Sequence, residues 1–220
     1  MKTNFFNTHI VGKSGTGKTF FASNKAASLL KEGKKVLYVT WYEDYSFPEA
    51  SSLVVAPPAG AAFMLSNNFD DDNFKYEDLE KTVKDFVQTN SSAKIIIPDA
   101  KIGPDRAEHV SRLLADVILN NKEFFADYFI FIDEINKFDD SKIQKLLSES
   151  KESRISLFFT HQYMGQFSDE LSEIILRTCK NIIFQISPSD SSLIASIVNT
   201  DSESLEKIKS YEYREFDPVN

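Results

Sequence analysis

The chain has 220 residues, of which 42% are hydrophobic and 26% are charged, a composition typical of a globular protein. Its 25 basic and 33 acidic side chains give a net charge of −8, which argues against a broad basic surface for nucleic acid. The single cysteine, Cys179, excludes an internal disulfide framework and a cysteine-based zinc site. We expect one domain spanning residues 1–220, located in the cytoplasm and without a membrane anchor, because no signal-peptide pattern or bilayer-length apolar run is present.

Apolar runs alternate with helical patterns along the chain, which predicts an α/β fold with a mostly parallel sheet covered by helices on both faces. In the first half we expect strand 8–11, helix 18–31, strand 35–41, strand 52–56, a loop over 59–75, helix 76–89 and strand 94–98. In the second half we expect helix 105–120, strand 128–132, helix 140–150, strand 155–160, helix 169–177, strand 181–186, helix 189–199, helical turns over 202–209 and an edge strand over 211–216.

The first strand is followed by a glycine-rich stretch that reads G-x-x-x-x-G-K-T and opens the first helix. In this context the pattern predicts a P-loop, in which backbone N–H groups and the positive end of the helix hold the phosphates of a nucleotide. Lys18 would reach the β- and γ-phosphates, and Thr19 would ligate Mg²⁺. The expected phosphate-binding residues are Gly12, Lys13, Ser14, Gly15, Thr16, Gly17, Lys18 and Thr19.

The most apolar strand, 128–132, ends in the acidic pair Asp133 and Glu134. A buried parallel strand delivers both carboxylates to the edge of the sheet where ligands bind. Asp133 is predicted to hold Mg²⁺, and Glu134 to orient and deprotonate the attacking water. The residues 136–139 that follow read Asn-Lys-Phe-Asp, which matches the guanine-reading motif of GTPases. We reject that reading because no D-x-x-G element lies upstream, so ATP is the expected nucleotide.

Strand 155–160 ends in Thr160, His161 and Gln162. A polar amide at the end of a strand beside the acidic pair can contact both the γ-phosphate and the attacking water. Gln162 is therefore the expected sensor of hydrolysis. We expect His161 to pack or face solvent rather than to catalyse, and we interpret His9 as a structural residue.

Together these stretches resemble the HerA–FtsK superfamily of P-loop motors, which includes DNA translocases, conjugation ATPases and the genome-packaging ATPases of tailless, membrane-containing viruses. The resemblance lies in four stretches, 9–19, 132–138, 154–162 and 181–186, the last followed by Ser189 and Asp190. It implies an α/β, RecA- or FtsK-like ATPase that moves double-stranded DNA. A chain without a large inserted domain is more similar to the viral packaging members of this superfamily. That resemblance implies a protein of the host cytoplasm or of the virion, with capsid or membrane-vertex proteins as partners.

The resemblance also implies roles for arginines, because members of the family complete each site with an arginine from a neighbouring subunit. The chain has only five arginines, and the candidates are Arg154 and Arg177. An arginine supplied in trans requires a homo-oligomeric ring, which is a hexamer by resemblance. Lys18, Thr19, Asp133, Glu134 and Gln162 keep the roles given above.

Other functions remain open on the sequence alone. A conjugation-type or phage-export ATPase, or a nucleotide-dependent switch or assembly factor, would use the same P-loop. A small-molecule kinase fits poorly, because it would need several arginines converging on two phosphoryl groups. Two regions are candidates for contact with DNA, residues 59–75 and the turn around Gly165 and Gln166.

Overall fold

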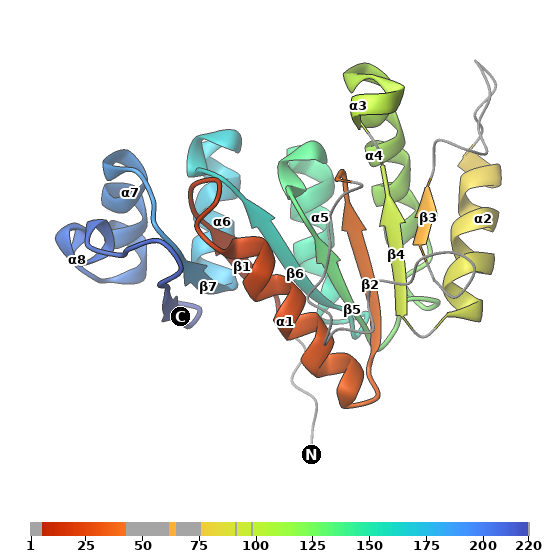
Figure 1. Cartoon of the computed structure of the whole chain (residues 1–220), viewed down its shortest axis with the longest axis horizontal. Coiled ribbons are helices and arrows are strands. Elements are labelled where there is room, and N and C mark those ends of the chain that lie inside the picture. Colours follow the sequence, from red (N-terminus) through yellow and green to blue (C-terminus); the bar gives the residue numbers. More distant parts are fainter. Residues whose placement is uncertain (1–5, 43–61, 65–75, 91, 98, 220) are drawn as a thin grey trace.

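The computed structural model describes residues 6–42, 62–64, 76–90, 92–97 and 99–219. These residues form one eight-stranded sheet with the strand order β3-β4-β2-β5-β6-β1-β7-β8 (Figure 1). Every neighbouring pair of described strands is parallel except β7 and β8, which are antiparallel. The strands are β1 (Thr8–Val11), β2 (Lys35–Thr40), β3 (Ala62–Met64), β4 (Ser92–Ile96), β5 (Tyr128–Ile132), β6 (Ser156–His161), β7 (Lys180–Ile183) and β8 (Arg214–Phe216).

Helices lie on both faces of the sheet, as the sequence predicts (Figure 1). Helix α1 crosses one face, and the other long helices pack on the opposite face. None of the described helices has the length and hydropathy needed to cross a bilayer. The helices are α1 (Lys18–Lys31), α2 (Tyr76–Thr89), α3 (Asp99–Ile102), α4 (Pro104–Asn120), α5 (Asp140–Ser150), α6 (Asp169–Thr178), α7 (Pro188–Val198) and α8 (Ser202–Glu206), with 3₁₀ turns η1 (Ile135–Lys137) and η2 (Met164–Gln166).

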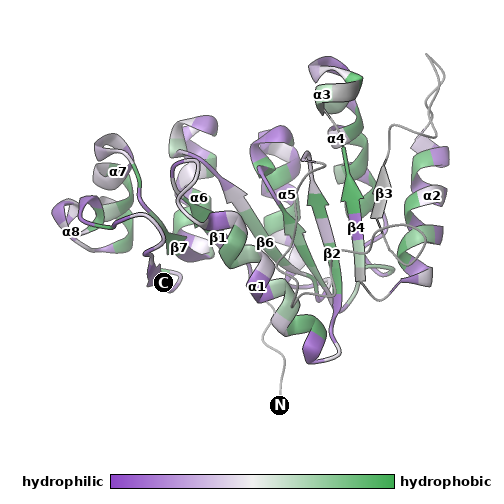
Figure 2. Cartoon of the chain, viewed as in Figure 1, coloured by the Kyte–Doolittle hydropathy of each residue, from purple (hydrophilic) through white to green (hydrophobic). Residues whose placement is uncertain are grey.

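The central strands β2 and β5 are mostly apolar because both of their faces are buried, and Figure 2 shows hydrophobic residues concentrated in the middle of the sheet. Alternate residues of β2 divide between the two cores: Leu37 and Val39 face α2, α4, α5 and α6, whereas Val36 and Tyr38 face α1. The core beneath α1 is aromatic. The ring of Phe131 stacks on Phe158 at 4.5 Å and on Tyr38 at 5.7 Å, which joins β2, β5 and β6.

Three expectations need correction. Residues 62–64, inside the predicted loop 59–75, form strand β3 on the edge of the sheet. Three residues are too few to show the alternation of apolar and polar side chains that predicts a strand. The pairing of β3 with β4 cannot be read from the local sequence. Strand β7 ends at Ile183 rather than at residue 186, because the chain then turns to contact the loop after β1. The short helix α3 has no counterpart among the predicted elements. The predicted strand 52–56 lies outside the described residues.

Candidate active site

The loop between β1 and α1 is fixed against the segment that follows β7. The backbone N–H of Lys13 donates to the Gln185 carbonyl at 2.8 Å, and the Thr16 hydroxyl donates to the Lys13 carbonyl at 2.8 Å. Gly12 lies so close to this segment that a Cβ atom there would be 2.6 Å from Cβ of Phe184. Only glycine fits this position without moving the backbone, so the loop shape depends on it.

The N-terminus of α1 is open toward the loop. Gly17 occupies the N-cap position with φ of 107°, no side chain caps the helix, and its first turn contains no acidic residue. The first N–H groups of a helix have no partner within the helix, and together with the helix dipole they favour a bound anion. By contrast, the hydroxyl groups of Ser168 and Ser187 cap α6 and α7. The start of α1 therefore suits a phosphate group.

Lys18, the first residue of α1, is folded back over the loop. Its Nζ donates to the Gly12 carbonyl at 2.6 Å and to the Lys13 carbonyl at 3.0 Å. Burial lowers the pKa of Lys18, and the negative charges of Asp133 and Glu134 oppose that shift. Lys18 and the acidic pair therefore share one electrostatic environment, although they are more than a hundred positions apart in the sequence.

Asp133 is almost completely buried at the carboxyl end of β5. The Thr160 hydroxyl, at the same end of β6, donates to Oδ1 of Asp133 at 2.5 Å and accepts from the Glu134 N–H at 3.1 Å. Burial raises the pKa of Asp133, whereas the Thr160 hydrogen bond acts in the opposite direction. The buried carboxylate of Asp133 and the half-buried hydroxyl of Thr19 are both oxygen donors, the ligand type that Mg²⁺ prefers.

The Glu134 side chain is held by two neighbours. Its Oε1 accepts from the Gln162 amide at 3.0 Å and from the Tyr42 hydroxyl at 2.7 Å. Glu134 itself has φ of 51° and ψ of 60°, a left-handed conformation that is uncommon for residues other than glycine. Such strain persists only where the surroundings enforce it, and it concentrates at functional sites. The structure therefore brings Glu134 and Gln162 together.

Tyr42 is a site residue that the sequence analysis missed. It follows β2, and the sheet order places β2 directly beside β5, so the ends of these strands meet. The order of strands in a sheet is not visible in a single sequence, and a tyrosine after a strand has no motif around it. An aromatic residue directly after the predicted strand 35–41 was the only available signal.

A second missed feature is a buried chain of polar side chains beneath the site. Asn181 uses its amide nitrogen to donate to the Leu176 and Cys179 carbonyls, so its oxygen accepts from Nδ1 of His9 at 2.7 Å. The other ring nitrogen of His9 lies 2.6 Å from Nε2 of His161, and Nδ1 of His161 lies 3.1 Å from the Tyr163 carbonyl. These polar side chains join β7, β1 and β6; β1 leads into the P-loop, and β6 leads to Gln162.

Both histidines of this pair are completely buried. Burial lowers the pKa of His9 to about 4 and also lowers the pKa of His161. Both rings are therefore neutral near neutral pH. His161 packs, as expected, with its ring 4.6 Å from that of Phe167. His9 is structural as expected, but it forms part of a network rather than standing alone.

The two candidate arginines lie far from the loop of their own chain. Arg154 lies two residues before β6 and pairs with Asp127, whereas Arg177 lies in the last turn of α6 and pairs with Glu173 at 2.8 Å. Both positions are at the amino edge of the sheet, and the P-loop is at the carboxyl edge. Neither arginine reaches the site of its own chain, so a role for either one requires a second subunit.

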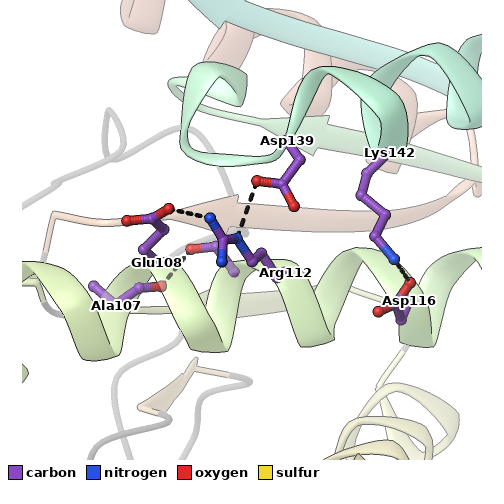
Figure 3. Close-up of polar contacts among 7 residues, drawn as sticks. Ala107, Glu108, Arg112, Asp116, Asp139 and Lys142 are labelled. Carbon is purple, nitrogen blue, oxygen red and sulfur yellow. Dashed lines mark hydrogen bonds and ion pairs between the residues drawn. The ribbon is translucent and has the colours of Figure 1, made fainter.

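The rejected guanine motif has a structural role in this chain. Asp139 pairs with Nε of Arg112 at 3.0 Å, and Lys142 pairs with Asp116 (Figure 3). These contacts join α4 to the start of α5. The motif residues 136–139 follow β5, and β6 separates β5 from the P-loop strand β1. Asp139 is thus occupied in holding two helices together on the far side of the acidic pair.

Comparisons with known proteins show a likeness in structure only. No protein-family model matches the sequence, and no curated protein has a detectably similar sequence. The genome-packaging NTPase B204 of Sulfolobus turreted icosahedral virus 2, in complex with AMP, superposes with a TM-score of 0.62 over 98% of this chain and 94% of its own, at 13% identity.

Two further solved structures are similar. VirB4 of Thermoanaerobacter pseudethanolicus has a TM-score of 0.62 over 97% of this chain and 89% of its own, at 10% identity. The bacterial conjugative coupling protein TrwB has a TM-score of 0.66 over 97% and 83%, at 7% identity. These likenesses, all at 13% identity or less, show that the chain has a P-loop NTPase fold.

Proposed function

We propose that the protein is a Mg²⁺-dependent ATPase that moves double-stranded DNA, with the packaging of a viral genome as its most specific form. The observation that supports hydrolysis most directly is the carboxylate of Glu134, which is held by Gln162 and shares its surroundings with Lys18. Support for the motor role comes from the fold, which the chain shares with a viral genome-packaging NTPase and a conjugative coupling protein.

In the proposed reaction, the N–H groups of the loop and the ammonium of Lys18 bind the phosphates. Glu134 accepts a proton from a water molecule whose oxygen attacks the γ-phosphorus, and ADP leaves. Gln162 orients this water and the Glu134 carboxylate. Mg²⁺, held through Thr19 and Asp133, would neutralise charge on the phosphate oxygens. Loss of the γ-phosphate would change the contacts of Gln162, whose backbone N–H is bonded to the Gln166 side chain at 2.8 Å.

The experiment that tests this proposal measures ATP hydrolysis with and without long duplex DNA. We expect duplex DNA to stimulate ATP turnover, because a motor couples ATP hydrolysis to movement along DNA. The Lys18→Ala variant serves as the background, since it lacks the ammonium that binds the phosphates. A rate of ATP hydrolysis that does not change when DNA is added would favour a switch or assembly factor. Transfer of the phosphoryl group to a metabolite would favour a kinase.

A ring with shared sites predicts rescue between two inactive variants. Arg154→Ala and Arg177→Ala each leave the variant's own loop intact, whereas Lys18→Ala leaves both arginines intact. If either arginine acts in trans, mixing its alanine variant with Lys18→Ala creates some sites with both groups present. We expect partial recovery, up to about a quarter of wild-type turnover if hexamers mix randomly and an arginine contributes its usual large factor. Turnover that stays at the sum of the two variants at every mixing ratio would count against both arginines.

A further inference from the structure

A groove lies beside the P-loop on the side away from the acidic pair. It has a volume of about 440 Å³ and runs between α1 and the segment that leads into β8. Gly17 belongs to both the loop and the groove, so the two are continuous. The groove is lined by Gly17, Phe20, Asn24, Phe184, Tyr211 and Tyr213, among others.

The groove has an aromatic floor and aromatic walls. The ring of Tyr213 lies 5.0 Å from Phe21 and 5.4 Å from Phe184, and these three rings form the floor. Phe20 and Tyr211 also line the groove, and they are 58% and 73% exposed. Large aromatic side chains exposed to this degree on both sides of one groove present flat apolar faces to a ligand.

Tyr211 is attached to the loop rather than free to move with the C-terminal segment. Its backbone N–H donates to the Thr16 carbonyl at 2.9 Å. Its ring is so close to the helix N-cap that a Cβ on Gly17 would be 3.1 Å from Cδ1 of Tyr211. The hydroxyl of Ser210 donates to the Gln185 side chain at 3.2 Å. This bond fixes the segment before β8 to the segment after β7, which itself contacts the loop. The wall of the groove is thus built onto the phosphate-binding loop.

The direction of a bound nucleotide follows from the proposed function, on which this inference rests. The terminal phosphate would face Glu134 and Gln162, which follow β5 and β6 on one side of β1. The nucleoside would then leave the loop on the opposite side, toward β7 and the segment before β8. The aromatic groove begins at that point.

We propose that the aromatic groove binds the base of the nucleotide, with Tyr211 and Phe20 as its stacking partners. Stacking on aromatic rings tolerates every base, because each base has a π-face. No aspartate or glutamate is among the described residues that line the groove, so no carboxylate is available to accept from N1 and N2 of guanine. The carboxamide of Asn24 can donate or accept. The groove therefore holds adenine and guanine with affinities within about tenfold of each other.

The test separates the base from the phosphates by calorimetric titration with ADP, GDP and inorganic pyrophosphate. Tyr211→Ala is expected to weaken ADP and GDP binding by about tenfold or more and to leave pyrophosphate binding unchanged. Tyr211→Phe keeps the ring and should restore ADP binding, and Phe20→Ala should repeat the loss from the other wall. The matched control is Tyr76→Ala, a tyrosine at the start of α2 and outside the groove, which should leave the ratio of ADP to pyrophosphate affinity unchanged.

The outcomes are distinguishable. Equal loss of ADP and pyrophosphate binding in Tyr211→Ala, or no loss of either, would overturn the base site. A wild-type preference of more than a hundredfold between ADP and GDP would overturn the stacking mode. If Tyr211→Ala instead changed the oligomeric state and left the ADP affinity intact, the groove would be a subunit contact. Failure of wild-type protein to bind either ADP or pyrophosphate would refute the proposed ATPase itself.

Discussion

Replacing Glu134 with glutamine is expected to lower ATP turnover by a factor of about 10² to 10⁴ while ATP remains bound. The amide oxygen of glutamine can still accept from Gln162 and from the Tyr42 hydroxyl, so the geometry around residue 134 is preserved. What is lost is the ability to take the proton of the attacking water. Single-turnover hydrolysis and nucleotide titration on the same preparation would measure the two effects.

Tyr42→Phe is the matched variant for that experiment. It removes only the hydroxyl that donates to Glu134 at 2.7 Å and leaves the carboxylate in place. We expect a loss of turnover of about tenfold, the scale of one hydrogen bond to a charged group. Wild-type turnover in Glu134→Gln would remove this residue from the role of base. A loss in Tyr42→Phe as large as that in Glu134→Gln would mean that the carboxylate acts mainly through its position.

The buried histidine pair predicts that the protein loses stability in mild acid. The pKa of His9 is about 4 in the folded protein and 6.5 for an unperturbed histidine. Between these values the unfolded chain binds a proton that the folded chain does not. The stabilisation is therefore complete above pH 6.5 and is lost as the pH falls toward 4. A lowering of this size corresponds to about 3 kcal/mol of unfolding free energy.

Urea unfolding at a series of pH values would measure this loss. His9→Gln is expected to be less stable than wild type at about pH 8, because the hydrogen bond to Asn181 is disturbed, but to show a flatter decline toward acid. The control is His109→Gln, which replaces the remaining histidine, an exposed residue on α4. His109→Gln should retain the wild-type slope. An unchanged slope in His9→Gln would show that other groups cause the acid sensitivity.

Local patterns made much of this molecule predictable. The fold class follows from the alternation of strands and helices, and several elements, including 8–11, 18–31, 76–89, 128–132 and 140–150, match their predicted ranges because their patterns are long or strongly apolar. The P-loop and the acidic pair were visible because each is a run of adjacent residues. Parallel strands then bring their carboxyl ends to one edge.

The features that were missed depend on which strands are neighbours. Tyr42 meets Glu134 because β2 lies beside β5, and His9 meets His161 because β1 lies beside β6. Neither pairing leaves a trace in the spacing of the sequence. The aromatic groove likewise requires that the segment around Tyr211 return to Thr16, nearly two hundred positions earlier. Strand β3 was missed because three residues carry too little pattern.

The placement of Arg154 and Arg177 on the edge of the sheet opposite the P-loop limits how subunits can associate if either arginine completes a neighbour's site. One subunit would have to offer its amino edge to the carboxyl edge of the next, as in a heterologous, head-to-tail ring. A two-fold dimer would complete both sites only if its subunits lay antiparallel, with each amino edge facing the other's carboxyl edge. Any open oligomer would leave one incomplete site at its end, and only closure would remove it, so activity per subunit would rise with assembly.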